Sequence, residues 1–277
     1  MRVGVELEGF VFSNWWFKDG GPVNVYHWIL SEYGREEWQT PEGVVVKTSA
    51  GWHMIELALP PVDLGEISLI PEMIHNVLKR FPPDWKFYWE GVDPCWIPSD
   101  QLWTPKKRYL VLKRALMIEC PQRWWGIEAM AKVAALHVHL DVDYSDKKEV
   151  IRLLNIFNNV NNGLQKNYAS RERIKKWWFG WANPCRLPSK KSRIFSSYEQ
   201  LEEFIGRIPR LLKKDENTGE FQVDLKNPSQ LGDSLAEETI WWWCRPRKSL
   251  GTIEVRIADS MEPKRIPGYI GKILSLI

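Results

Sequence analysis

The stretch AALHVHLDV, residues 134–142, decides the fold, because apolar side chains alternate in it with His137, His139 and Asp141. Successive side chains of a strand point to opposite faces, so this alternation predicts a β-strand with one apolar face and one polar face that carries both imidazoles. The apolar face requires a packed layer against it, and the polar face requires partners for two histidines. We therefore expect a sheet with one buried side and one chemically active side.

The same two-residue alternation occurs in strands predicted elsewhere in the chain. Charged side chains share one face in each of them: Glu6 with Glu8 in residues 2–12, Glu56 in a hairpin over residues 44–59, and Glu254 with Arg256 in residues 241–257. We expect the hairpin to turn near residues 49–51 and to end at Pro60-Pro61, since proline cannot donate to a sheet ladder. Residues 86–91 predict one more short strand.

Apolar residues at helical spacing predict helices between these strands, over residues 64–80, 106–118, 146–166 and 198–212. Pro71 marks a kink or a boundary inside the first helix. Residues 213–234 are polar and rich in turn-forming residues, so we expect loops there. The chain has no internal repeat, low-complexity tract or linker, and we interpret residues 1–277 as a single α+β domain.

The composition of the chain limits the kinds of protein and of binding partner that are compatible with it. Hydrophobic residues make up 44% of the chain, charged residues 26%, and the formal net charge is +3, which does not indicate a nucleic-acid partner. The four cysteines form no C-x-x-C pair, so zinc-knuckle and redox motifs are not supported. Charged first residues and the lack of a long apolar run lead us to expect a cytoplasmic protein without a membrane span. The sequence does not fix the oligomeric state, and a homo-oligomer is compatible with it.

Carboxylates and imidazoles on several strands are the groups that bind divalent ions. Hard ions such as Mg²⁺ take oxygen ligands, and histidine among the carboxylates also suits Mn²⁺. Each pattern has an ordinary structural explanation as well: a solvated sheet face for Glu6 and Glu8, a hydrogen-bonded core pair for the histidines, and a cross-strand ion pair for Glu254 and Arg256. The recurrence of such strands favours a site that cations and a ligand fill.

Basic residues in the C-terminal half are candidates for phosphate binding. Arg245 and Arg247 precede the last charged strand, and guanidinium groups bind phosphate oxygens in pairs, although a solvated basic turn is an alternative. Lys191 and Arg193 end a basic stretch over residues 170–193, for which a surface charge run is the alternative. The sequence contains neither a P-loop nor a Rossmann glycine motif, so any ATP must be held by metal ions and arginines.

Six segments, taken in order, carry a resemblance to a known family: GVELEGF at 4–10, MIELALPP at 54–61, PKKRY at 105–109, ALHVHLDVDYS at 135–145, KSRIF at 191–195 and RPRKSLGTIEVRIADS at 245–260. They resemble the gamma-glutamylcysteine synthetase (glutamate–cysteine ligase) branch of the glutamine-synthetase-like carboxylate–amine ligases, with the related amidoligases close to it. The resemblance implies an antiparallel sheet curved into a catalytic funnel, with helices packed on its outer face. ATP is then expected at one end, metal ions in the middle and an amino-acid carboxylate at the other end.

The resemblance also implies a reaction and a role for each candidate residue. ATP phosphorylates a carboxylate of an amino acid or small peptide, and an amine displaces phosphate from this acyl phosphate to form an amide. The expected ligands of Mg²⁺ or Mn²⁺ are Glu6, Glu8, Glu56, His137, His139 and Glu254. The expected catalytic arginines are Arg256, Arg245 and Arg193, and the expected ATP-binding residues are Arg245, Arg247 and Lys191.

The substrates stay open, because the chain is short and the family's segment of small residues is matched only loosely by WANPCRLP at 181–188. Two other functions are compatible with these residues. A metal-dependent hydrolase can use histidines and carboxylates to activate water, and a non-catalytic module can bind nucleic acid or protein through tryptophans and a basic stretch. The arginines favour the ligase, since a nucleotide needs them and a neutral substrate does not.

Overall fold

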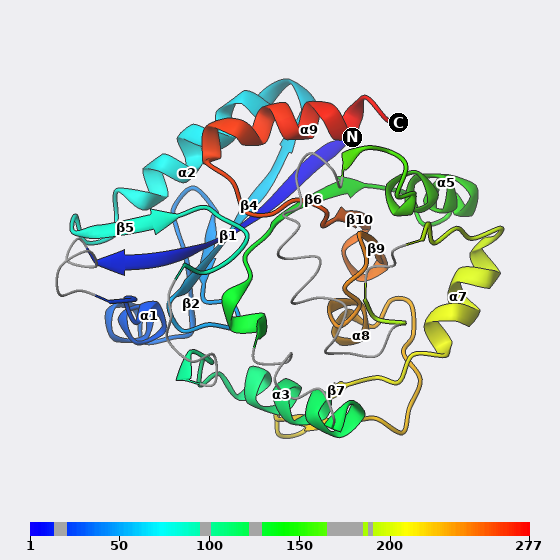
Figure 1. The fold of residues 1–277 in the computed structure, drawn as a ribbon, viewed down its shortest axis with the longest axis horizontal. Helices are drawn as coiled ribbons and strands as arrows, with labels where there is room; N and C mark the ends of the chain where they lie inside the picture. The colour runs from blue at the N-terminus through cyan, green and yellow to red at the C-terminus, as the bar shows by residue number, and fades with distance from the viewer. Residues whose placement is uncertain (14–20, 95–100, 122–128, 165–184, 188–190) are drawn as a thin grey trace.

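The fold is built around an eight-stranded antiparallel sheet with the order β2-β3-β4-β1-β6-β10-β9, and β5 pairs with the end of β1 (Figure 1). The computed structural model describes residues 1–13, 21–94, 101–121, 129–164, 185–187 and 191–277. The strands are β1 (Arg2–Ser13), β2 (Glu37–Gln39), β3 (Val45–Lys47), β4 (Met54–Asp63), β5 (Trp85–Tyr88), β6 (Leu136–Asp141), β9 (Cys244–Arg247) and β10 (Thr252–Val255).

One face of this sheet is apolar and is covered by helices. Alternate residues of β1, such as Val3, Val5 and Leu7, join apolar residues of β4, β6 and β10 in the main hydrophobic core. The helices that supply the other half of this core are α2 (Ile70–Leu78), α5 (Lys147–Asn158), α7 (Tyr198–Gly206) and α9 (Ile266–Leu274). Helices α2 and α9 run side by side along one side of β1 in Figure 1. The predicted α+β class and the helical layer on one face are thus confirmed.

The other side of the sheet faces α3 (Lys107–Glu119) and a small hairpin of β7 (Leu212–Lys214) and β8 (Phe221–Val223). A second apolar cluster holds these elements together, with Leu112 and Leu116 of α3 packed against Leu211, Leu212 and Trp241. The described residues also form α1 (Val25–Tyr33), whose Val25 and Ile29 lie in the main core, and α8 (Ser234–Glu238). Among the described residues, no helix is long and apolar enough to cross a membrane.

Local chemistry explains where several helices begin and end. The Asp146 side chain accepts a hydrogen bond from the backbone N–H of Glu149 at the start of α5, and Ser197 does the same for α7. Helix α1 ends at Gly34, whose φ of 67° is the left-handed conformation that glycine adopts without strain.

Several predicted boundaries were wrong. The helix predicted over residues 198–212 ends at Gly206, and Leu212 begins β7. Strand β4 does not end at Pro60-Pro61 but continues to Asp63, because a register shift between Val3 and Val5 of β1 takes up an extra residue opposite the prolines. The helix predicted over residues 64–80 is divided into a 3-10 turn, Leu64–Leu69, and α2. The boundary predicted at Pro71 is confirmed, since Pro71 lies in the first turn of α2, where its missing N–H costs nothing.

Helix α5 ends at Asn158 rather than at residue 166, because the next residue, Asn159, has an extended backbone conformation. The side chain of Asn158 bonds to strand β9. Its Nδ2 donates to the Cys244 carbonyl at 2.8 Å and its Oδ1 accepts from the Cys244 N–H at 3.0 Å. The polar segment 213–234 contains β8 and the end of β7, and α8 begins at its last residue, so it is not made of loops alone.

Candidate active site

Rows of charged side chains cross the face of the sheet opposite the helical core. In the first row, the antiparallel register places Glu56 between Lys47 and Glu8. In the second row, Glu6 lies opposite His137. In the third row, Glu254 lies between His139 and Arg245. Arg256 extends the second row, since its Nη1 lies 3.3 Å from His137 Nδ1. The carboxylates thus lie toward the middle of the sheet, with Lys47 on β3 at one side and arginines at the other.

Glu254 is fully buried and is held by two arginines. Arg245 donates from Nε to Glu254 Oε2 at 2.5 Å, and Arg256 donates from Nη1 to Oε1. Burial alone would raise the pKa of Glu254, but the guanidinium groups of Arg245 and Arg256 hold it well below its usual range. The cross-strand ion pair that the sequence left open is therefore present.

Arg245 also fixes the position of α8. Its Nη1 donates to three carbonyl oxygens at the end of that helix, at 2.9, 2.8 and 3.1 Å, those of Glu237, Glu238 and Ile240. Arg245 and Arg247 are both buried on β9. The alternative of a solvated basic turn is thus wrong, because the chain forms a hairpin of β9 and β10 here instead of a single strand.

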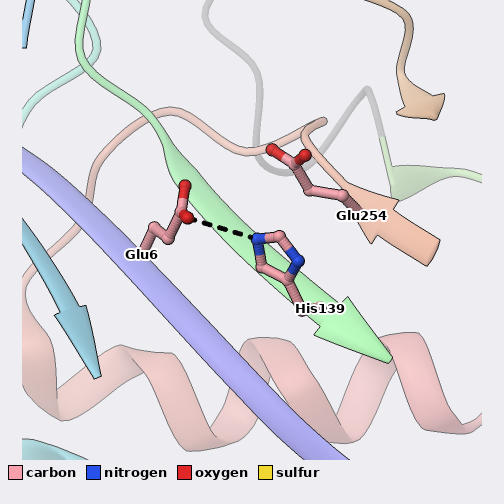
Figure 2. A group of neighbouring side chains, drawn as sticks. All are labelled: Glu6, His139 and Glu254. Atoms are coloured by element: carbon pink, nitrogen blue, oxygen red, sulfur yellow. Dashed lines mark ion pairs between the residues drawn. The ribbon is translucent and has the colours of Figure 1, made fainter. Parts of the chain in front are cut away.

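Glu6 faces both histidines of β6. Its Oε2 lies 3.1 Å from His137 Nδ1, and its Oε1 lies 3.6 Å from His139 Nε2. Burial would raise the pKa of Glu6, but the interactions of its carboxylate with His137 and His139 hold it well below the usual value. Figure 2 shows Glu6 on β1 and His139 on β6 turned toward each other, with Glu254 of β10 beside them.

Glu6, His139 and Glu254 form a cluster that could hold a metal ion. One ligand atom from each of these residues lies within 4.8 Å of the others. Thr252 Oγ1 lies 3.1 Å from His139 Nδ1, which leaves Nε2 on the side of Glu6. Within the part of the chain that the structure describes, the buried Nε2 atoms of His137 and His139 have no hydrogen-bond partner. Two carboxylates and an imidazole with an unused lone pair suit Mg²⁺ or Mn²⁺.

Glu8 and Glu56 are also buried, so the explanation of a solvated sheet face is wrong for this part of the sheet. Glu8 accepts hydrogen bonds from Ser49 Oγ at 2.8 Å and from the Ala135 N–H at 2.9 Å. Glu56 pairs with Lys47 at 3.0 Å. Burial raises the pKa of Glu56, and the Lys47 ammonium group partly offsets this effect. Each carboxylate therefore has a partner supplied by the protein.

A cavity separates the charged face from α3. Seven of the eleven candidate residues line it: Glu6, Glu8, Glu56, His137, Arg245, Arg247 and Arg256. The sequence did not single out its other polar lining residues, among them Lys47, Arg108, Tyr109 and Glu238. Burial, together with the charge of Glu56, raises the pKa of Tyr109 to about 12, so this phenol stays protonated. The PKKRY segment lay in the family resemblance, but nothing in it distinguished Arg108 or Tyr109.

Glu238 links two arginines across the cavity. Arg108 of α3 forms an ion pair with its Oε2, and Arg247 of β9 lies 3.4 Å from its Oε1. Arg247 is buried, and its Nε has no hydrogen-bond partner among the described residues. A guanidinium in this state can bind an anionic group that enters the cavity.

Four candidate residues are not among those that line this cavity: His139 and Glu254, which pair with the lining residues Glu6, Arg245 and Arg256, and Arg193 and Lys191, which lie away from it. The Arg193 guanidinium lies 4.6 Å from the Trp242 ring centre and 5.2 Å from that of Phe204. Lys191 is exposed and is not among the described residues that line the cavity. Most of the basic stretch 170–193, with Trp177 and Trp178, lies outside the described residues, as do the tryptophan pairs at 15–16 and 124–125.

The lowered pKa of His137 makes the stability of the fold depend on pH. Burial, and then the charge of Arg256, lower its pKa from 6.5 to about 4. Between these values the unfolded chain binds a proton that the folded chain excludes, so stability is complete above pH 6.5 and falls as the pH drops toward 4. The loss amounts to roughly 3 kcal/mol at most.

Urea unfolding at a series of pH values measures this effect. His137→Gln is expected to flatten the slope between pH 6.5 and 4, whereas His75→Gln, at an exposed position of α2, is expected to leave it unchanged. An equal slope in wild type and His137→Gln would show that other groups control acid unfolding in this window.

Comparison with known proteins supports the fold. A scan against protein-family models finds no match, and a search of curated proteins finds none either. The crystal structure of glutamate–cysteine ligase from Francisella tularensis in complex with AMP has a TM-score of 0.51 and 10% sequence identity, over 93% of this chain and 61% of that chain. A bifunctional glutathione synthetase from Pasteurella multocida gives a TM-score of 0.48 and 13% identity, over 99% of this chain and 39% of that chain.

The likeness to the Francisella enzyme shows a shared α+β fold across most of this chain. This chain spans less than two thirds of the length of either protein.

Proposed function

We propose that this chain is an ATP-dependent carboxylate–amine ligase that forms an amide through an acyl phosphate. The observation that carries the proposal is the convergence of carboxylates, histidines and arginines on one buried sheet face beside a cavity. Buried charges persist when they are paired or when they serve a ligand. An enzyme that brings together a nucleotide, a metal ion and a second anion needs such a mixed face.

The residues that would hold Mg²⁺ or Mn²⁺ are Glu6, His139 and Glu254, with His137 beside them. Such an ion supplies positive charge that stabilises phosphoryl transfer. The protein's part is to fix its ligands: Thr252 orients His139, and Arg245 holds Glu254 against α8.

The arginines of the face would bind the anionic groups of the substrates. Arg256 and Arg247 line the cavity, and each has a buried Nε atom without a hydrogen-bond partner among the described residues. Fixed donors of this kind stabilise charge that develops on phosphate or on a carboxylate, without reorganisation of the protein. Arg245 acts instead as a positioning residue, since its Nε and Nη1 are used by Glu254 and α8.

The likeness to glutamate–cysteine ligase supports the same activity, since the structure of that enzyme was determined with AMP. We propose an amino acid or small peptide as the acid and an amine as the second substrate. A metal-dependent hydrolase would use the same carboxylates and histidines, but it would leave Arg247 and Arg256 without a role at the cavity.

The test is ADP release in the presence of Mg²⁺ and a panel of paired acids and amines. A ligase is expected to release ADP and phosphate only when both an acid and an amine are present, with formation of the amide detected by mass spectrometry. Omission of the acid, the amine or the metal provides three controls. Metal-dependent cleavage of an amide without ATP consumption would favour the hydrolase instead.

A further inference from the structure

Lys47 is a charged residue of the cavity to which the roles above give no function. It lies on β3 directly opposite Glu56 of β4, and its Nζ lies 3.0 Å from Glu56 Oε1. The Glu56 side chain is 9% exposed and the Lys47 side chain 32%, so the pair lies at the boundary between the sheet and the cavity. The register of β3 and β4 therefore fixes an ammonium group against a buried carboxylate.

Two carboxylates meet at this side of the face. Glu56 lies opposite Glu8 on β1, and two buried carboxylates on adjacent strands repel each other unless a cation lies near them. A divalent ion is one way to supply this charge, and Lys47 is another. Among the described residues, Glu8 and Glu56 belong to no group of three ligands with the geometry of Glu6, His139 and Glu254.

We propose that the ammonium group of Lys47 is a resident cation at Glu56, and that this face takes a single divalent ion, between Glu6, His139 and Glu254. This inference rests on the metal site of the proposed ligase. Glu56 then serves to position Lys47 rather than to bind metal. The pair with Glu56 engages one of the three N–H donors of an ammonium group.

The charge of Lys47 also affects which ligands the cavity can bind. An ammonium group binds phosphate as a compact point charge, and Lys47 lines the cavity together with Arg256. Lys47 then neutralises an anionic group of the ligand on the β3 side, where a second metal ion would otherwise do so.

Counting bound Mn²⁺ tests the proposal without any measurement of turnover. The free Mn²⁺ signal in electron paramagnetic resonance gives the number of ions bound to the full chain in the absence of nucleotide. Wild type is expected to bind about one ion, and Lys47→Met about two, because Glu8 and Glu56 then lack their resident charge. Lys47→Arg keeps the charge and is expected to stay at about one.

The variant Glu56→Gln distinguishes an ion bound near Glu56 from an ion bound by Glu6, His139 and Glu254. In the wild-type background this substitution is expected to leave the number of bound ions unchanged, and in the Lys47→Met background it is expected to remove the second ion. Thermal unfolding of each variant establishes that it is folded.

Two results would overturn the inference alone: two ions on wild type, one of them lost in Glu56→Gln, or a folded Lys47→Met variant that still binds a single ion. Absence of Mn²⁺ binding in wild type and in every variant would instead contradict the metal site of the proposed function, and the inference with it.

Discussion

Replacing Glu254 with glutamine is expected to lower amide-forming turnover by about 100-fold or more. Glutamine carries no charge, so the proposed metal ion loses a ligand, and Arg245 and Arg256 lose the carboxylate that fixes them. Initial rates of ADP release with the best acid and amine pair measure the loss. Weaker Mn²⁺ binding is expected in the same variant.

The same substitution is expected to destabilise the protein, because it leaves two buried guanidinium groups without their counter-charge. The cost is on the order of 3 kcal/mol, which urea unfolding measures. Glu66→Gln, at an exposed position before α2, is the matched control and should change neither quantity. Unchanged turnover in a folded Glu254→Gln variant would remove this residue from the active site.

Replacing Arg186 with methionine is expected to cause the largest loss of stability, about 3–5 kcal/mol. Arg186 is fully buried, and its Nε lies 3.1 Å from both carboxylate oxygens of Glu119 at the end of α3. Its other nitrogens donate to Thr239 and to the Pro209 carbonyl. Methionine fills a similar volume but leaves Glu119 as a buried, uncompensated charge.

Chemical denaturation measures this effect, and Arg207→Met provides the control. Arg207 also pairs with a glutamate, Glu203, but both side chains are about two thirds exposed, at 67% and 65%. An exposed pair contributes about 1 kcal/mol or less. Equal losses in the two variants would contradict the structural role of Arg186. Because Arg186 anchors α3, which lines the cavity, Arg186→Met is also expected to weaken substrate binding.

The strands of the central sheet were predictable because their side chains alternate strictly. Residues 2–8 and 136–141 place apolar side chains on one face and polar side chains on the other, and the two-residue period is the direct signature of that arrangement. The hairpin of β7 and β8 was missed, since two three-residue strands, LKK and FQV, are too short to establish a period. The end of α5 was missed because apolar residues continue at helical spacing to Leu164, although the backbone already leaves the helix at Asn159.

The candidate site was predictable where one strand carries the pattern by itself. Glu6, His137 and Glu254 were found in this way, and the structure brings them together. Lys47 was missed because its partner depends on the register between strands, which no local pattern encodes. Arg193 was predicted as a site residue because it lies in a basic stretch of the sequence. In the structure its guanidinium packs on the Trp242 ring, away from the cavity.

The rows of charged side chains also stabilise the native register of the strands. A slip of β10 by one residue against β6 would turn Glu254 into the apolar core and Val255 toward the cavity. Such an arrangement would bury an unpaired carboxylate, which is far costlier than a lost apolar contact. The carboxylates proposed for the chemistry therefore also favour the native register of the strands over registers shifted by one residue. Replacing them with apolar residues would make strand pairing less specific.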